Sequence, residues 1–236
     1  MRISRRPTIA IVALILCVGC HASIPPGPVP CPTVPQLRLP DVQAQIATYI
    51  DSGRYDADVA GVVDTARVWL EQRAPSAPQP AIVLDIDETS LSNWAAYHVN
   101  GWSRILGGPC DLERGPCGIR AWQAMGRSAG LAPTVALVQR ARELGVAVFF
   151  ITGRPPELRE ATERNLREQG YTWDGVILLP PGQKFDSAVD FKAPERRRIA
   201  ERGYTIVLNM GDQQSDLDGG YAERTFKLPN PVYVLP

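Results

Sequence analysis

The stretch Ala81-Ile82-Val83-Leu84-Asp85-Ile86-Asp87-Glu88-Thr89 places an apolar run directly before two carboxylates. A short apolar run bounded by Pro80 and a polar cluster is typical of a buried strand. In a parallel α/β sheet, such a strand delivers its last residues to the carboxyl edge, where ligands bind. The sequence therefore predicts Asp85 and Asp87 at the mouth of a site, as nucleophile, metal ligand or general acid. A simpler interpretation is an acidic strand end at which Asp87 caps a helix.

Two later stretches repeat this pattern of an apolar run that ends in polar residues. Residues 146–151 form an apolar strand followed by Thr152-Gly153-Arg154. A hydroxyl group and free backbone N–H groups at a following helix start can hold a phosphate. Residues 205–210 form a strand that opens into Gly211-Asp212-Gln213-Gln214-Ser215-Asp216. The two carboxylates of this turn are hard oxygen ligands of the kind that Mg²⁺ prefers.

A lysine stands at a position where it can reach the same edge. The stretch Phe191-Lys192-Ala193-Pro194 precedes a basic helix that is expected over residues 195–202. Lys192 can extend from the start of that helix to the sheet, although an isolated lysine is more often an ordinary surface residue. The run Arg196-Arg197-Arg198 is expected to be a solvated helix face.

The periodicity of apolar residues predicts alternating helices and strands. Helices are predicted over residues 41–50, 55–73, 133–144, 157–169 and 195–202, and strands over residues 81–84, 146–151, 176–179, 205–210 and 226–228, the last as an edge strand. Such alternation indicates an α/β fold with a parallel sheet. The polar clusters that follow the strands are then expected to meet at one edge.

Size and charge narrow the class of protein. The chain has 236 residues, of which 44% are hydrophobic and 21% are charged, enough for one α/β domain with an insertion. Its formal net charge is zero. Because no basic surface is indicated, no nucleic-acid polymer is expected as a partner.

The N-terminus carries the features of an export signal. Positively charged residues 1–6 precede an apolar run at 9–18 that is too short for a typical membrane span. We therefore predict a signal peptide over residues 1–22 and an exported protein, periplasmic or on the outer surface. Cys17-Val18-Gly19-Cys20 resembles a bacterial lipoprotein cleavage site, with Cys20 lipidated as the sole membrane attachment, although Cys17 stands where Leu is usual. Ordinary cleavage after Ala22 is the alternative.

The remaining chain is expected to be a tether and one domain. Residues 23–40 are Pro-rich and predict a semi-extended tether. Residues 41–236 are the domain, with an insertion over about 90–131, because the crossover after Thr89 is longer than one helix requires. The insertion is expected either to act as a lid that contacts substrate or to pack onto the core. Its aromatic residues and its histidine are the candidates for either role: Trp94, Tyr97, His98, Trp102 and Trp122.

Two cysteines bracket a short loop in this insertion. Export permits disulfides, and Cys110 and Cys117 are the natural pair. In the chain-entropy model, closing so small a loop stabilises the fold by about 2.5 kcal/mol, less any strain. A metal site on these cysteines is less favoured because no other Cys or His stands at zinc-ligand spacing. Cys31 has no assigned partner.

The polar stretches together resemble the four motifs of the haloacid-dehalogenase (HAD) superfamily of phosphotransferases. Those motifs are an Asp-x-Asp-x-Thr loop, a Ser or Thr at a second strand end, a Lys, and a Gly-Asp-x-x-x-Asp turn. The chain is most similar to the acid phosphatase and vegetative storage protein group, through residues 85–93, 150–155, 211–217 and 226–231. A related group of bacterial surface lipoprotein acid phosphatases has Asp where this chain has Ser92.

The resemblance implies a fold and a reaction. The fold is a HAD-like (Rossmannoid) parallel sheet flanked by helices, with a small cap inserted after the first motif strand. The reaction is Mg²⁺-dependent hydrolysis of a small phosphomonoester. Asp85 attacks phosphorus and becomes an aspartyl phosphate, while Asp87 protonates the leaving oxygen and then activates water. The metal ligands implied are Asp85, the backbone carbonyl of Asp87, and Asp212, with Asp216 acting through a water. The phosphate-binding residues implied are Thr152, Gly153 and Lys192.

Three functions stay open at this point. The first is an exported acid phosphatase, which the presence of Asp85 favours. The second is a non-catalytic storage or ligand-binding protein on the same fold, because some members of the resembled group have lost the nucleophile. The third is a phosphotransferase that uses the same aspartyl phosphate. If Trp94, Tyr97 or Trp102 stacks on a substrate base, nucleotides are expected to be preferred, as in a nucleotidase.

Overall fold

A five-stranded, fully parallel sheet lies at the centre of the described chain. The computed structural model describes residues 37–183 and 185–235, so the predicted signal peptide, Cys20 and most of the tether lie outside the described residues. The strands are β1 (Pro80–Leu84), β4 (Ala147–Ile151), β5 (Gly175–Ile177), β6 (Thr205–Gly211) and β7 (Thr225–Lys227). Their order is β5-β4-β1-β6-β7, with every pair parallel. The predicted α/β class and the edge strand near residue 226 are confirmed.

Strand β1 lies inside the sheet and has a parallel partner strand on each side. It pairs with β4 on one side and with β6 on the other. Ile82 and Leu84 pack into the core on one face, while Ala81 and Val83 pack into the core on the opposite face. The chain leaves β1 toward β4 and β5 on one side and later returns to place β6 on the other side, so the strand order reverses at β1, where a crevice is expected beyond the carboxyl end.

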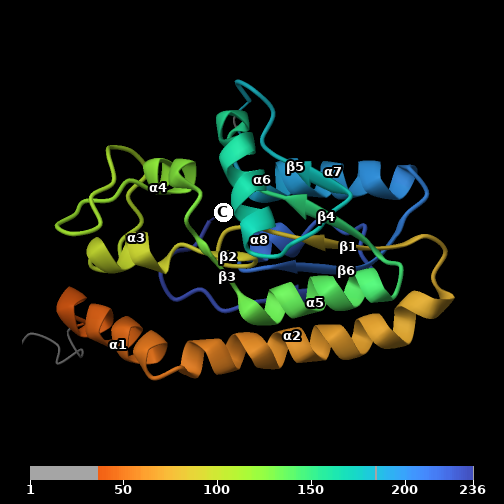
Figure 1. Ribbon diagram of the computed structural model, residues 1–236, viewed down its shortest axis with the longest axis horizontal. Coiled ribbons are helices and arrows are strands. Elements are labelled where there is room, and N and C mark those ends of the chain that lie inside the picture. Colours follow the sequence, from red (N-terminus) through yellow and green to blue (C-terminus); the bar gives the residue numbers. More distant parts are fainter. Residues whose placement is uncertain (1–36, 184, 236) are drawn as a thin grey trace, which may run out of the picture. The chain divides into compact units, whose positions relative to one another are not determined.

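Helices cover both faces of the sheet (Figure 1). α2 (Arg54–Arg73) and α5 (Ala132–Glu143) lie side by side along one face, and α1 (Leu39–Asp51) precedes α2. α7 (Ala188–Glu201) covers the other face, where it contributes Phe191 and Ile199 to the second core cluster. No helix in the described part of the chain is both long enough and apolar enough to cross a membrane.

The segment after the first motif folds into its own small elements. These are β2 (Leu91–Ser92), α3 (Trp94–Val99), α4 (Ile119–Met125) and β3 (Ala129–Gly130). β2 and β3 pair antiparallel and bring the two ends of the segment together. α3 and α4 lie beside the edge at which the strands of the large sheet end (Figure 1). Sequence reasoning did not anticipate the β2–β3 ribbon, because two strands of two residues leave no periodic signal.

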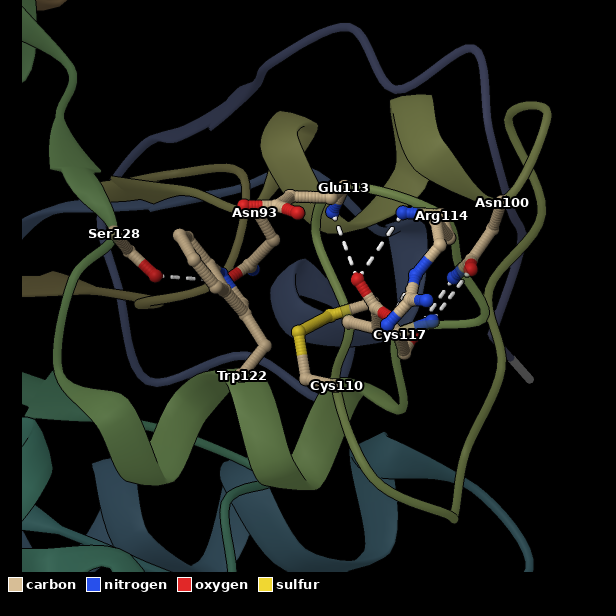
Figure 2. The surroundings of a disulfide bond; sticks show 9 residues. Asn93, Asn100, Cys110, Glu113, Arg114, Cys117, Trp122 and Ser128 are labelled. Atoms are coloured by element: carbon tan, nitrogen blue, oxygen red, sulfur yellow. Dashed lines mark hydrogen bonds and ion pairs between the residues drawn. A yellow bond between two sulfur atoms is a disulfide. The ribbon is translucent and has the colours of Figure 1, made fainter.

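A disulfide joins Cys110 and Cys117 in the loop between α3 and α4 (Figure 2). Asn100 fixes this loop, since its side chain donates to the Cys117 carbonyl and accepts from the Cys117 N–H, both at 2.8 Å. Nearby, Trp122 Nε1 and Ser128 Oγ each donate to Asn93 Oδ1 at 3.0 Å. The inserted segment is therefore held to the residue that follows the first motif.

Helix α7 differs from its prediction in extent. It begins at Ala188, seven residues before the expected start at Glu195, because Ser187 caps it by accepting from the Val189 N–H at 3.3 Å. Lys192 therefore lies inside the helix and not before it. Pro194 is tolerated within the helix. The missed signal was the serine followed three residues later by Asp190, a recognisable N-terminal pattern.

The interpretation of Arg196 as part of a solvated face was wrong. Its side chain is fully buried and donates to the carbonyl oxygens of Asp216 at 2.6 Å, of Gly220 at 2.9 Å and of Asp218. Its neighbour Arg197 is exposed, as expected, and pairs with Glu201. Arg196 therefore fastens α7 to the turn that carries the second pair of carboxylates.

We expect Arg196→Met to lower the free energy of unfolding by about 3 kcal/mol, because it leaves buried carbonyl oxygens without their charged donor. Arg197→Met removes an exposed ion pair from the same helix and is expected to change stability little. Urea unfolding followed by circular dichroism measures both. Similar losses in the two variants would show that the buried contacts of Arg196 do not hold this turn.

Candidate active site

One pocket of about 140 Å³ opens at the carboxyl edge of the sheet. The connections after β1, β4 and β6 and the first turns of α7 bring the predicted residues to its wall. Those that line it are Asp85, Asp87, Gly153, Lys192, Asp212 and Asp216. The four polar clusters found in the sequence therefore meet in space, as parallel topology requires.

Lys192 lies between two of the carboxylates. Its ammonium donates to Asp85 Oδ1 and, at 2.6 Å, to Asp216 Oδ1, and all three side chains are buried. Burial raises the pKa of Asp85 well above its ordinary value, and the charge of Asp216 adds to this against the opposing effect of Lys192. The lysine itself stays charged, because the two carboxylates outweigh the cost of its burial and raise its pKa.

The turn after β6 holds its two carboxylates by different means. Asp216 is fixed through both oxygens, since Oδ1 accepts from Lys192 and Oδ2 accepts from the Gln213 N–H at 3.0 Å. Gly211 permits this closeness, because a Cβ there would lie 2.5 Å from the Asp216 side chain. Asp212 accepts from Asn230 Nδ2 at 2.6 Å. Asn230 lies in the C-terminal segment, which sequence reasoning had used only as a sign of resemblance.

Three carboxylates are placed where they can share a cation. Oxygen atoms of Asp85, Asp212 and Asp216 lie within 4.8 Å of one another, and all three residues are buried. Burial and then the nearby charges of Asp216 and Glu88 raise the pKa of Asp212 to about 7. A buried set of hard oxygen donors that repel one another fits a divalent cation such as Mg²⁺. The carboxylate of Asp87 is not part of this cluster.

Asp87 is held instead by a buried arginine. Arg154 Nη2 donates to Asp87 Oδ1 at 2.7 Å and Arg154 Nε donates to Oδ2 at 3.1 Å. Asn93 Nδ2 at 2.8 Å and Gln123 Nε2 at 3.1 Å also donate to Oδ1. Burial alone would raise the pKa of Asp87, but the ion pair with Arg154 and these hydrogen bonds outweigh it and lower the pKa. Asp87 is therefore ionised in the resting protein.

Sequence reasoning missed Arg154 as a residue of the site. It had noted a cation after Thr152-Gly153 and assigned it no role. Thr152 is buried behind the pocket wall and does not line it. Its hydroxyl accepts from the Arg154 N–H at 3.2 Å. In this structure Thr152 thus supports the loop that presents Gly153 and Arg154.

Glu88 joins three separate parts of the chain behind the pocket. This fully buried residue has a positive φ of 55°, and it accepts from the Asn93 N–H at 2.7 Å. It also accepts from the hydroxyl groups of Tyr97 at 3.1 Å and Tyr233 at 2.8 Å. Burial and the adjacent charge of Asp87 raise the pKa of Glu88 to about 7. The first motif, α3 and the C-terminal segment are thereby tied together.

The aromatic residues proposed for base stacking are mostly directed elsewhere. Trp94 and Trp102 do not line the pocket and pack edge-on with ring centroids 6.1 Å apart. His98 is exposed and rests against Trp102, away from the pocket. Tyr97 alone of these lines the pocket. The packing alternative therefore fits Trp94 and Trp102, and His98 does not line the pocket in which a substrate would be contacted.

Comparison with known proteins identifies the family. The model of the HAD superfamily, subfamily IIIB (Acid phosphatase), matches residues 33–236. The chain belongs to this family. The predicted resemblance is confirmed, and the family's reaction class is phosphomonoester hydrolysis.

Curated relatives and a solved structure agree with this assignment. The stem 28 kDa glycoprotein of Glycine max is 32% identical over 79% of this chain and 72% of its own length. Vegetative storage protein 1 of Arabidopsis thaliana is 34% identical over 73% of this chain and 57% of its own length. Acid phosphatase 1 of Solanum lycopersicum is 33% identical over 65% of this chain and 58% of its own length. The class C acid phosphatase of Bacillus anthracis with tungstate bound shares the fold, with a TM-score of 0.64 and 22% identity over 83% of this chain and 86% of that chain.

The chain spans little more than half the length of two of the relatives it matches. The curated relatives named here are plant proteins, and they give no support for a bacterial lipid anchor at Cys20.

We expect Arg154→Met to destabilise the fold by about 3 kcal/mol at neutral pH, because it leaves the carboxylate of Asp87 largely buried without a cation. Adding Asp87→Asn to this variant removes the stranded charge and is expected to restore part of the loss. Chemical unfolding of the single and double variants tests this. If the double variant is less stable than Arg154→Met, the two side chains are not a coupled pair.

The same ion pair predicts a dependence on pH. A carboxyl group whose pKa is lowered in the folded state contributes stability above its ordinary pKa of about 4 and loses it as pH falls through the folded pKa. In Arg154→Met burial is no longer offset by the ion pair, so the pKa of Asp87 rises above its ordinary value of about 4. The stability difference between the wild type and Arg154→Met is therefore expected to be largest near neutral pH, to begin to shrink above about pH 4 and to go on shrinking as pH falls toward the lowered pKa of the wild type. Unfolding curves measured across this range would contradict the pairing if the difference stayed constant.

Proposed function

We propose that this protein is an exported, Mg²⁺-dependent acid phosphatase that forms an aspartyl phosphate on Asp85. The observation that carries the proposal is the position of Asp85. It lies in the pocket beside Lys192 and within the carboxylate cluster of Asp212 and Asp216. A nucleophile, a fixed cation and a metal-type donor set are the parts that phosphoryl transfer requires.

Each residue then has a distinct task. Asp85 attacks phosphorus while Lys192 neutralises charge on the phosphoryl oxygens, and the backbone of Gly153 offers a further donor. Asp85 and Asp212 would hold the metal together with the backbone carbonyl of Asp87, and Asp216 orients Lys192. The bound metal supplies charge neutralisation at the phosphoryl group that carboxylates would otherwise repel.

Asp87 serves as the general acid and then as the base. Arg154 keeps it ionised near neutral pH, so its protonated fraction increases only as the solution becomes acid. A leaving oxygen that needs a proton is therefore released best in acid solution, which agrees with an acid optimum. In the next step the ionised form is the one that activates water to release Asp85.

Two other functions compete with hydrolysis. A storage or ligand-binding role is favoured by the names of relatives such as vegetative storage protein 1. The aspartate at position 85 argues against it, because a protein without catalysis has no need of a nucleophile held by a lysine. Transfer of the phosphoryl group to an alcohol uses the same residues and is distinguished only by the acceptor.

Export and the cap are further parts of the proposal. Export is supported by residues 1–22, and lipidation of Cys20 stays a sequence-based prediction because these residues lie outside the described part. The inserted segment at about 90–131 acts as a cap, which is supported by Tyr97 and Gln123 lining the pocket.

Asp85→Asn is expected to reduce phosphate release at least a thousandfold, because an amide cannot form the acyl phosphate. Phosphate release from a panel of phosphomonoesters, with and without Mg²⁺, measures this. The wild type is expected to lose activity when the metal is chelated and to regain it when Mg²⁺ is returned.

Asp58→Asn, which changes an exposed carboxylate of α2, is the matched control and is expected to keep full activity. Full activity in a folded Asp85→Asn variant would exclude the covalent mechanism. A folded wild type that binds Mg²⁺ but releases no phosphate would support the storage role, and transfer to an added alcohol in preference to water would support the phosphotransferase.

A further inference from the structure

Two arginines of the inserted segment line the pocket and have no role in the chemistry described above. Arg104 follows α3, and Arg120 lies at the start of α4. Among residues 37–183 and 185–235, neither guanidinium has a carboxylate within ion-pair distance. The other two cations of the pocket are fully engaged, since Lys192 pairs with Asp85 and Asp216 and Arg154 pairs with Asp87.

These two arginines are less buried than the carboxylate of Asp85. Arg104 stacks over the ring of Tyr233 with its guanidinium carbon 5.1 Å from the ring centroid. A guanidinium held by its face keeps its in-plane N–H groups free to donate to a planar anion. Arg120 is exposed, whereas Asp85 is buried at the end of β1. The pair is thus placed to meet the part of a substrate that lies beyond the phosphoryl group.

The size of the pocket limits how large that part is. Its volume of about 140 Å³ is well below the several hundred Å³ of sites that enclose drug-sized ligands. Leu106 and Ile119 provide apolar surface in the same pocket. A short carbon chain that ends in an anionic group matches this combination of small volume, apolar surface and two cations that have no carboxylate partner among the described residues.

We infer that the preferred substrate is a small phosphomonoester whose leaving group carries a second anionic group, a carboxylate or a second phosphate, bound by Arg104 and Arg120. This inference rests on the proposed phosphatase function and names its substrate class. It differs from the earlier expectation of a nucleobase stacked on Trp94, Tyr97 or Trp102, of which Tyr97 alone lines the pocket.

The test uses phosphomonoesters of matched size that differ at one end. Ethyl phosphate has a terminal methyl group, 2-phosphoglycolate a carboxylate and 2-aminoethyl phosphate an ammonium group. Ethane-1,2-diol bisphosphate tests a second phosphate in place of the carboxylate. Values of kcat/KM are measured for the wild type, Arg104→Gln, Arg120→Gln and Arg127→Gln. Arg127 is an exposed arginine of the same inserted segment that does not line the pocket, and it serves as the control.

In Arg104→Gln and in Arg120→Gln, we expect kcat/KM for 2-phosphoglycolate to fall about tenfold relative to kcat/KM for ethyl phosphate. A fall of this size corresponds to the loss of one charge-assisted hydrogen bond to the carboxylate. The ratio for 2-aminoethyl phosphate to ethyl phosphate is expected to rise. Arg127→Gln should leave both ratios unchanged. The response of the bisphosphate decides whether a phosphate is accepted as well as a carboxylate.

Two results would overturn the inference. Ratios that stay constant in all variants would show that the arginines do not contact the leaving group. An equal loss for every substrate in Arg104→Gln and Arg120→Gln would show that they bind the transferring phosphoryl group instead.

Failure of the proposed function is recognised separately. If the wild type hydrolyses none of these esters, calorimetric binding of phosphonoacetate and of ethylphosphonate at fixed Mg²⁺ replaces kinetics. Tighter binding of phosphonoacetate that is lost in Arg104→Gln would keep the second-anion site while the phosphatase proposal fails. Equal binding of the two phosphonates would reject the second-anion site as well.

Discussion

The crowding of buried carboxylates at the end of β1 is the constraint on which the rest of the structure depends. Asp85, Asp212 and Asp216 bring like charges within a few ångströms of one another in a desolvated pocket. Such a cluster is unfavourable unless cations share it. Lys192 supplies one charge from α7, and the arrangement of the oxygens suits a divalent metal for the remainder.

Much of the surrounding fold can be understood as support for this cluster. Parallel strands deliver the carboxylates to one edge, and buried Arg196 fastens the turn after β6 to the helix that carries Lys192. Asn230 reaches Asp212 from the C-terminal segment. Residues far apart in the sequence therefore fix the directions of the charged groups, which is how a protein preorganises a site for phosphoryl transfer.

A second set of contacts separates the two carboxylates of the first motif. Asp85 is coupled to Lys192, while Asp87 is turned toward Arg154 and bonded by Asn93 and Gln123. The pKa of Asp85 is raised and the pKa of Asp87 is lowered, although the two residues are only two positions apart in the sequence. Two carboxylates in different environments are the usual basis for dividing the roles of nucleophile and proton carrier.

The sequence by itself determined the α/β class, the strands that carry the chemistry, and the residues Asp85, Asp87, Lys192, Asp212 and Asp216. It did so because buried parallel strands are short apolar runs, and the polar residues that follow them must meet at one edge. Only the tertiary structure decided which cations face which carboxylates. The roles of Arg154, Arg196, Arg104 and Tyr233 depend on contacts between segments up to 145 residues apart, such as the bond from Tyr233 to Glu88. No local pattern records such contacts, since an arginine in a sequence looks the same whether packing leaves it in solvent or buries it against an acceptor.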